Sequence, residues 1–206
     1  MAKQSQLEQQ ILQAAEELFL DKGYDATSTT DIAKRVGCNQ ALVHYYYRTK
    51  ENLFEQIFMK KTQLLLSYIN PDNQPNWEFE PALLHFIDSY FEMLSHHRRM
   101  PFFLIKELIL NEDRRNMLRL QMLRNSEKLG YYAQWDKLVK AEVAKGTIRP
   151  METMDLTLDV ISLIVFTFIS LPLYSDLFQQ NEEQLNAYLL RRKEEVTKLI
   201  LNGIRA

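Results

Sequence analysis

The chain has 206 residues and 46% of them are hydrophobic, so it can bury one large core or two small ones and is not globally disordered. Only 5 glycines and 6 prolines occur, which favours helices. A net charge of −2 excludes a protein coated in positive charge, and the single Cys38 excludes an internal disulfide. The polar start MAKQSQLEQQ lacks the apolar stretch of an export signal, so we expect a cytoplasmic protein.

The first predicted helix begins with a capping box, in which Ser5 and Glu8 each cover an amide left open at the helix start. Gly23 marks its end, because glycine readily adopts the left-handed conformation found after many helices. Between these signals the apolar residues recur at the spacing of one helix face. The predicted buried face consists of Ile11, Ala14, Ala15, Leu18 and Phe19.

Two short helices follow, each with its own start signal. Ser28 and Asp31 form a second capping box, and the helix they open ends at Gly37. Asn39 caps the next helix, and Thr49 caps a fourth one. A helix, a turn of three or four residues with a glycine, and a second helix make the helix-turn-helix arrangement. Plain helical hairpins share this pattern and are the alternative.

The second helix of a helix-turn-helix enters the major groove of DNA, so one side packs inward and the other faces the duplex. Val43 and Tyr47 are four residues apart and share the predicted inward face. We expect Tyr46 to direct its hydroxyl at a phosphate, and Tyr45 to pack on the sugar-phosphate edge or a base methyl group. Gln40 has the donor and acceptor pair suited to adenine. The predicted DNA-contacting residues are Thr29, Thr30, Gln40, Ala41, His44, Tyr45, Tyr46 and Lys50.

Helix starts and a local charge bias suggest phosphate contacts. Lys50 begins the fourth helix, where its ammonium and the open amides would bind an anion together. Thr29 and Thr30 could do the same in the first turn of the second helix. No acidic residue lies between Asp31 and Glu51, a window that holds Lys34, Arg35, Arg48 and Lys50. Such a basic island could face an anion, although short charge biases also arise by chance.

The rest of the chain is predicted to be helical after a loop over residues 70–81, which is rich in proline and asparagine and marks a boundary between two units. The uncharged stretch 160–175 is shorter than a bilayer span and is interrupted by Pro172, so we interpret it as a buried helix rather than a membrane segment. The predicted helices cover residues 81–96, 101–111, 114–145, 153–171 and 183–203.

Residues 11–54 resemble the tetracycline-repressor (TetR) family of bacterial one-component regulators. Two positions depart from the family pattern. Cys38 stands where an aliphatic residue is usual and is either a small buried hydrophobe or a redox sensor. His44 precedes the tyrosines where the family more commonly has a tyrosine first. The matching positions are Gly23-Tyr24, Thr27-Ser28-Thr29, Asp31-Ile32-Ala33, Gly37, the tyrosine trio, Lys50-Glu51 and Leu53.

This resemblance implies an all-α fold, with an N-terminal helix-turn-helix DNA-binding domain over residues 1–58 and a larger effector-binding and dimerisation domain over 59–206. It implies a repressor that binds a near-palindromic double-stranded DNA operator as a homodimer and is released by a small hydrophobic effector. The homodimer would form through the helices near 153–171 and 183–203. The first of these is apolar nearly all round and must be buried on most sides. A central core helix of a monomer is the alternative.

Aromatic residues of the larger domain are candidates for the effector pocket, although most would also serve as ordinary core. His96 and His97 have no cysteine or acidic partner at ligand spacing, so we expect no metal site, and we expect no cofactor. The candidate pocket residues are Phe86, Tyr90, Phe91, Phe103, Tyr131, Trp135, Phe166 and Phe168.

An enzyme and a helical adaptor are the two alternatives to a repressor. An enzyme is not expected, because the chain carries no glycine-rich phosphate loop, no HExxH, no G-x-S-x-G and no CxxC. A helical adaptor could use the helix-turn-helix for protein contacts without binding DNA. An affinity for duplex DNA that falls steeply with salt separates the repressor from both.

Overall fold

The computed structural model describes residues 2–69, 78–124 and 126–206. Among these residues no strand occurs, and an isolated bridge joins Ile148 to Arg205. The fold is therefore all-α, as predicted. Its helices are α1 (Ala2–Lys22), α2 (Thr29–Val36), α3 (Gln40–Tyr47), α4 (Lys50–Ile69), α5 (Phe79–His96), α6 (Met100–Leu110), α7 (Glu112–Arg124), α8 (Ser126–Lys145), α9 (Thr153–Phe178) and α10 (Glu182–Ile204).

The predicted caps of the short helices are confirmed. The Ser28 hydroxyl accepts a hydrogen bond from the Asp31 amide, and the Asp31 carboxylate accepts one from the Ser28 amide, which is the complete capping box. The Asn39 side chain accepts from the Leu42 amide at 3.0 Å and so fixes the start of α3. Thr49 caps α4 in the same way.

Several predicted helix bounds were wrong. Helix α1 begins at Ala2, ahead of the predicted start at Ser5. The predicted helix 114–145 corresponds to α7, which begins earlier at Glu112, and α8, and residue 125 between them lies outside the described residues. Helix α9 continues through Pro172 to Phe178, because its packing outweighs the loss of one backbone hydrogen bond at the proline. The predicted loop 70–81 lies mostly outside the described residues, and its end from Phe79 onward belongs to α5.

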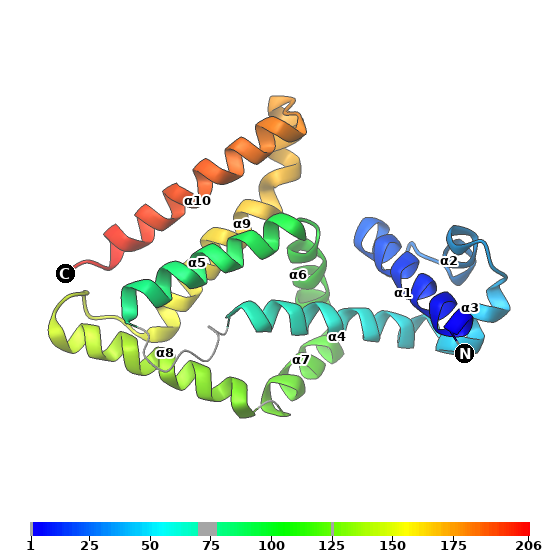
Figure 1. Cartoon of the computed structure of the whole chain (residues 1–206), viewed down its shortest axis with the longest axis horizontal. Helices are drawn as coiled ribbons and strands as arrows, with labels where there is room; N and C mark the ends of the chain where they lie inside the picture. Colours follow the sequence, from blue (N-terminus) through cyan, green and yellow to red (C-terminus); the bar gives the residue numbers. More distant parts are fainter. Residues whose placement is uncertain (1, 70–77, 125) are drawn as a thin grey trace.

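The molecule has two parts, which we call the head and the body (Figure 1). The head consists of α1, α2, α3 and the first turns of α4, and the body contains α5 to α10. Helix α4 runs from the head into the body, so it crosses the predicted domain boundary after residue 58 without a break. A movement of the body can therefore reach the head directly along one rod.

Aromatic packing joins the two parts along α4. Phe54 and Phe58 are completely buried, and both rings lie near the ring of Phe103 on α6, at centroid distances of 5.5 and 6.5 Å. The Phe54 ring also meets Tyr24 of the head edge-on at 4.9 Å. Burying one such side chain contributes about 1.5–3 kcal/mol, so this aromatic cluster holds α4 firmly in both parts.

Helix α9 forms the centre of the body and packs against α5, α6, α8 and α10. By length and composition it is long and apolar enough to cross a membrane, and 39% of its most apolar window is buried inside the chain. The core helix of a soluble protein passes the same test. Large apolar side chains on its outer side are exposed, namely Met154, Leu158, Phe166, Leu173, Leu177 and Phe178.

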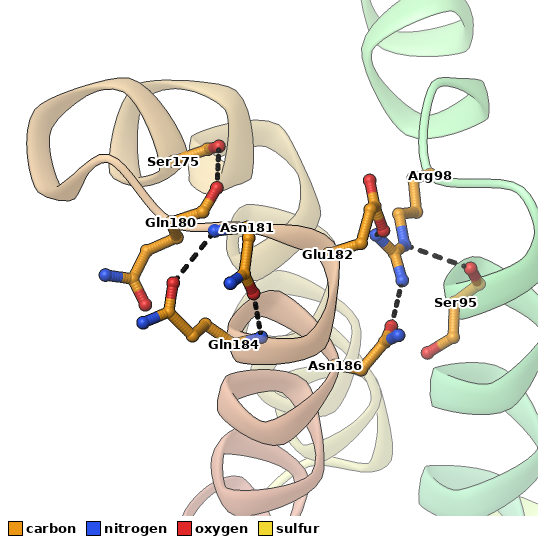
Figure 2. A network of polar contacts seen from close by, with 8 residues as sticks. All are labelled: Ser95, Arg98, Ser175, Gln180, Asn181, Glu182, Gln184 and Asn186. Carbon is orange, nitrogen blue, oxygen red and sulfur yellow. Dashed lines mark hydrogen bonds and ion pairs between the residues drawn. The ribbon is translucent and has the colours of Figure 1, made fainter.

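A polar cluster ties the turn between α5 and α6 to the start of α10 (Figure 2). The Arg98 guanidinium donates to the Glu182 carboxylate at 3.0 Å and to the Asn186 side-chain oxygen, and its Nε donates to the Ser95 carbonyl at 3.3 Å. Asn181 begins α10 with a capping box completed by Gln184. These contacts fix the N-terminal end of α10 against the body.

Candidate nucleic-acid interface

The turn between α2 and α3 has the geometry of a helix-turn-helix. The Cys38 amide donates to the Ala33 carbonyl and the Gly37 amide to the Lys34 carbonyl, which is the Schellman arrangement. It requires a left-handed residue after the helix, and Gly37 supplies it at φ 78° and ψ 28° without a side-chain clash. Helix α3 therefore starts after a tight, well-bonded turn, with its position fixed relative to α2.

One side of α3 packs into the head as predicted. Val43 and Tyr47 are buried, and the Tyr47 hydroxyl donates to the Glu8 carbonyl on α1 at 3.0 Å. Burial, helped by the nearby Glu8 carboxylate, raises the pKa of Tyr47 to about 12. Tyr47 therefore anchors α3 to α1.

The opposite side of α3 faces solvent. Gln40, Ala41 and His44 are exposed, and the Tyr45 side chain is 68% exposed. Tyr46 is half-buried, and the Tyr45 and Tyr46 rings meet edge-on at 5.2 Å. These residues share one accessible surface that has the size and shape of a helix face.

The start of α2 adjoins this surface. Thr30 is exposed and Thr29 is half-buried, and the Gln40 amide nitrogen lies 2.8 Å from the Thr29 hydroxyl oxygen. The fold thus brings together seven of the eight predicted DNA-contacting residues, all except Lys50.

A chain of polar contacts runs along the exposed side of α3. The Gln40 amide nitrogen also lies 3.3 Å from Nε2 of His44, and Nδ1 of His44 lies 3.1 Å from the Arg48 carbonyl oxygen. Gln40 and His44 are one helical turn apart, so they meet on the same face. The sequence reading placed both residues on this face but missed the contact between them.

The structure gives Lys50 a different place from the predicted one. Its ammonium donates to the carbonyls of Tyr24 and Thr27 at 3.0 and 3.1 Å, and it lies 4.0 Å from the centre of the Tyr24 ring. The side chain therefore ties the start of α4 to the loop between α1 and α2. Two of its three N–H groups are therefore used within the head, and one remains for the predicted phosphate contact.

The predicted basic island is only partly available to an anion. Arg35 forms an ion pair with Glu17 at 2.8 Å, and Lys50 points to the loop. Lys34 and Arg48 are exposed, and within the described part of the chain neither forms an ion pair. The free positive charge beside α3 therefore comes from these two side chains.

Helix α3 ends in a strained turn at Arg48. Its backbone has φ 61° and ψ −54°, and the Thr49 amide lies 2.6 Å from the Tyr47 carbonyl oxygen. This is a γ-turn with a positive φ at its centre, a rare conformation that costs on the order of 1–3 kcal/mol in a residue other than glycine. The turn ends α3 at Tyr47 and changes the direction of the chain before α4 begins at Lys50.

An ionic cluster at the joint between head and body was missed in the sequence. Arg114 on α7 is buried, and its guanidinium lies 2.5 Å from Glu51 and 3.7 Å from Glu55, both on α4. It also lies 3.9 Å from Glu107 on α6 and 4.5 Å from the Phe54 ring centre. Nε of Arg114 is buried without a hydrogen-bond partner. We call Arg114 and these three glutamates the Arg114 cluster.

The carboxylates of the Arg114 cluster have opposite pKa shifts. Burial raises the pKa of Glu107, and the attraction of Arg114 compensates only in part. Burial also acts to raise the pKa of Glu51, but hydrogen bonds from Tyr24 and Arg114 outweigh it, so this pKa is lowered. Burial and the hydrogen bond to Glu51 raise the pKa of Tyr24 to about 12. Arg114 is thus shared between α4 and the body, with its tightest contact to α4.

The predicted effector-pocket residues do not line one cavity. Phe166 points outward on α9 and is 67% exposed, so its assignment to an interior pocket was wrong. Trp135 stacks on Phe79 at 5.6 Å and donates its indole N–H to Thr157, as an ordinary core residue does. The side chain of Tyr131 lies outside the described residues. The core holds the others: Phe86, Tyr90, Phe91, Phe103 and Phe168.

Phe91 also lines a groove between α5 and α10. This groove has a volume of 430 Å³ and mixes apolar walls with polar and charged groups. The Phe91 ring meets Phe168 of α9 edge-on at 5.1 Å, which connects the groove wall to the centre of the body. Its remaining walls are Glu92, Ser95, Asn186, Leu189, Leu190 and Lys193.

The chain is thus all-α, and its head carries a helix-turn-helix whose second helix is exposed. Residues 11–57 match the family model described as bacterial regulatory proteins of the tetR family. The similarity to the TetR family thus covers the head of the chain.

Named relatives agree with this similarity. The chain is 43% identical over 51 residues to the HTH-type transcriptional regulator QacR of Staphylococcus aureus. These residues make up 25% of this chain and 27% of QacR. It is 26% identical over 99 residues to the biofilm operon icaADBC HTH-type negative transcriptional regulator IcaR of Staphylococcus aureus, covering 46% of this chain and 51% of IcaR. The matches thus span about a quarter and about half of these relatives.

Similarity to a solved structure covers the body as well as the head. A solved bacterial regulatory protein of the tetR family from Rhodococcus RHA1 matches with a TM-score of 0.68. This match covers 94% of this chain and 96% of the other at 20% sequence identity. At that identity the likeness concerns the fold alone, so the body shares the fold of that structure.

Proposed function

We propose that the protein is a ligand-responsive transcriptional repressor that binds a near-palindromic DNA operator as a homodimer. The observation that carries the proposal is the exposed face of α3, held by Tyr47 on one side and presenting Gln40, Ala41 and His44 on the other. A short helix with polar residues at its start suits the major groove. The family of the head and the name of IcaR as a negative regulator support repression.

Each exposed residue has a role in this proposal. Thr29, Thr30 and Tyr46 donate hydroxyl hydrogens to phosphates, and Tyr45 packs on the sugar-phosphate edge. Ala41 is small enough to contact a thymine methyl group, and Gln40 and His44 face base edges. Lys34 and Arg48 supply positive charge to the backbone. Lys50 positions α4 and the loop before α2 rather than binding phosphate.

The homodimer is proposed to form through α9 and α10. The exposed apolar side chains on the outer side of α9 recur along most of its length, and Leu199 adds another on α10. An exposed apolar surface of this kind is characteristic of an interface. A two-fold axis would then present two copies of α3 to two half-sites of one operator, so its sequence should be near-palindromic.

The effector is proposed to be a small hydrophobic molecule that binds the body and releases the operator. Such a ligand must bind the DNA-free arrangement better than the DNA-bound one, or it shifts nothing. Helix α4, the aromatic cluster and the Arg114 cluster offer a physical link between body and head. The groove beside Phe91 is our candidate entry site. A protein of this kind acts in the cytoplasm.

Binding to duplex DNA tests the proposal. The purified protein is offered a random duplex pool, and the selected sequence is titrated by fluorescence anisotropy at several salt concentrations. We expect a near-palindromic selected sequence and an affinity that falls steeply with salt. A helical adaptor, the alternative function, would select no sequence and show no salt-dependent affinity.

A further inference from the structure

The Gln40 side chain has both of its N–H groups occupied. Its amide nitrogen carries two hydrogens and lies 2.8 Å from the Thr29 hydroxyl oxygen and 3.3 Å from Nε2 of His44. Two donors thus face two acceptors. Its carbonyl oxygen accepts no hydrogen bond from any residue that the structure describes, and the residue is exposed.

The His44 ring is compatible with this arrangement in only one neutral form. Nδ1 lies 3.1 Å from the Arg48 carbonyl oxygen, which can only accept a hydrogen bond, so Nδ1 carries the hydrogen. In the neutral ring Nε2 then carries the lone pair and accepts from Gln40. The Arg48 carbonyl therefore determines which way the Gln40 amide is turned.

Both anchors of Gln40 sit on ordered elements. Thr29 is the first residue of α2, and His44 lies one turn after Gln40 on α3. The capping box at Ser28 and the Asn39 cap fix the starts of these two helices. The amide is thus pre-oriented, which lowers the entropy lost when it contacts a base.

From this geometry we infer that the Gln40 side chain can only accept a hydrogen bond from its base. It therefore selects the amino group of adenine or cytosine, which donates one. In the major groove only adenine N6 and cytosine N4 donate, whereas guanine and thymine present acceptors at the corresponding edge. A two-bond contact to adenine needs a free N–H for N7, and Gln40 has none. The inference deepens the proposed function and rests on it.

Thr29 gains a defined role from the same contact. Its hydroxyl oxygen accepts from Gln40, so the hydroxyl hydrogen is left to donate to a phosphate. One phosphate contact and one base contact are thereby linked through a single hydrogen bond. Thr29 is a positioning residue for Gln40 as well as a phosphate donor.

Base analogues test the inference with the unchanged protein. The operator position read by Gln40 is the one whose base preference disappears in Gln40→Ala. If this position is adenine, replacing adenine with purine removes the amino group and leaves the Gln40 carbonyl without its donor, which should weaken binding about 5- to 150-fold, equivalent to ~1–3 kcal/mol. Replacing it with 7-deazaadenine removes only N7 and should leave affinity unchanged. If the position is cytosine, removing its amino group should weaken binding to the same extent.

Three outcomes overturn the inference: removal of the amino group leaves affinity unchanged, 7-deazaadenine weakens binding as much as purine does, or Gln40→Ala relaxes no position. Absence of DNA binding by the unchanged protein would instead refute the proposed function, so the two failures are distinguishable. Releasing the amide gives a second test. In the double variant Thr29→Val with His44→Ala the amide is free to turn, and affinity should become sensitive to 7-deazaadenine. Continued insensitivity of a folded double variant would count against the two anchors.

Discussion

Three adjacent tyrosines on α3 show how one residue type takes three roles within a single turn. Tyr47 is buried and bonded to α1, Tyr46 lies half-buried at the edge of the exposed face, and Tyr45 is mostly in solvent. Successive residues of an α-helix are rotated by about 100°, so the three rings must point in different directions. The buried ring fixes the helix, and the other two rings remain accessible for the proposed contacts with DNA.

Alkaline pH should reveal the buried tyrosine. The pKa of Tyr47 is raised from 10.0 to about 12 in the folded chain, so the unfolded chain loses this proton first. We expect the free energy of unfolding to fall as pH rises from 10 to about 12. In Tyr47→Phe the fall should be smaller, with Tyr24 accounting for part of the rest, and the lost bond to Glu8 should cost about 1 kcal/mol at pH 7.

Denaturant unfolding at a series of pH values measures both effects. Tyr45→Phe is the matched control, because this side chain is 68% exposed, and it should leave the pH dependence as it was. An identical alkaline slope in Tyr47→Phe and the unchanged protein would show that Tyr47 does not titrate differently on folding.

Lys50 should contribute more to the stability of the fold than to the salt dependence of DNA binding. Lys50→Met removes hydrogen bonds from an ammonium to two carbonyls, and bonds from charged donors contribute about 1.5–3 kcal/mol. We expect lower stability and an unchanged salt dependence of DNA binding. Lys34→Met, a change at an exposed cation, should instead reduce the salt slope by about 1 with stability nearly unchanged.

Thermal unfolding and anisotropy titrations of both variants decide between the two roles of Lys50. A stable Lys50→Met protein whose salt slope has dropped would restore the phosphate contact predicted from the sequence.

At the scale of helices, local signals in the sequence predicted the head well. Ser28, Asp31, Gly37 and Asn39 act within three or four residues of themselves, so their meaning can be read without the fold. The C-terminal end of α9 depends on packing between distant segments. Pro172 did not end this helix, because tertiary contacts keep α9 intact around it. Short-range chemistry was predictable, whereas the outcome of competition with packing was not.

The Arg114 cluster shows the same limit for functional residues. Arg114 is 59 or more positions away from Glu51 and Glu55, and nothing in their sequence neighbourhoods pairs them. An arginine in the first turn of a helix is unfavourable beside the helix dipole, and this was the only local sign of a partner elsewhere. The carbonyl contacts of Lys50 were not predicted for a related reason, because both partners lie more than twenty residues away.

Removing Arg114 should loosen α4 from the body. Arg114→Met leaves buried or half-buried carboxylates without their cation, and breaking such a cluster costs on the order of 3 kcal/mol. We expect a lower free energy of unfolding in a urea titration. Arg119→Met, at an exposed position of the same helix, is the control and should stay within about 0.5 kcal/mol of the unchanged protein. Equal stabilities of the two variants would mean that the cluster does not hold the joint.

At the scale of the whole molecule, the outer side of α9 is an exposed apolar surface, and its burial against a partner would be favourable. The apolar pattern in the sequence predicted a buried helix, and the single chain buries only part of it. Composition alone could not distinguish the centre of a monomer from a surface shared by two copies. The exposed Phe166 and Leu173 favour the shared surface.

A charged side chain on the outer side of α9 should dissociate the proposed homodimer. Phe166→Glu places a carboxylate in the proposed interface, where desolvation without a partner is unfavourable. We expect the dimer to give way to monomer in analytical ultracentrifugation at micromolar concentration, with the helical circular dichroism retained. Phe102→Glu changes an equally exposed phenylalanine on α6 and should leave the dimer intact. A Phe166→Glu dimer of unchanged stability would place the interface elsewhere.

In the proposed complex with DNA, the γ-turn at Arg48 limits how many base pairs α3 of one chain can contact. It ends α3 after 8 residues, a rod of roughly 12 Å at 1.5 Å per residue. Against a base-pair rise of about 3.4 Å, such a rod passes only three or four base pairs. A sequence of three or four base pairs recurs by chance throughout a genome. In the proposed homodimer, discrimination would therefore depend on a second copy of α3 at a fixed distance, and the spacing of the two half-sites would carry as much information as their sequences.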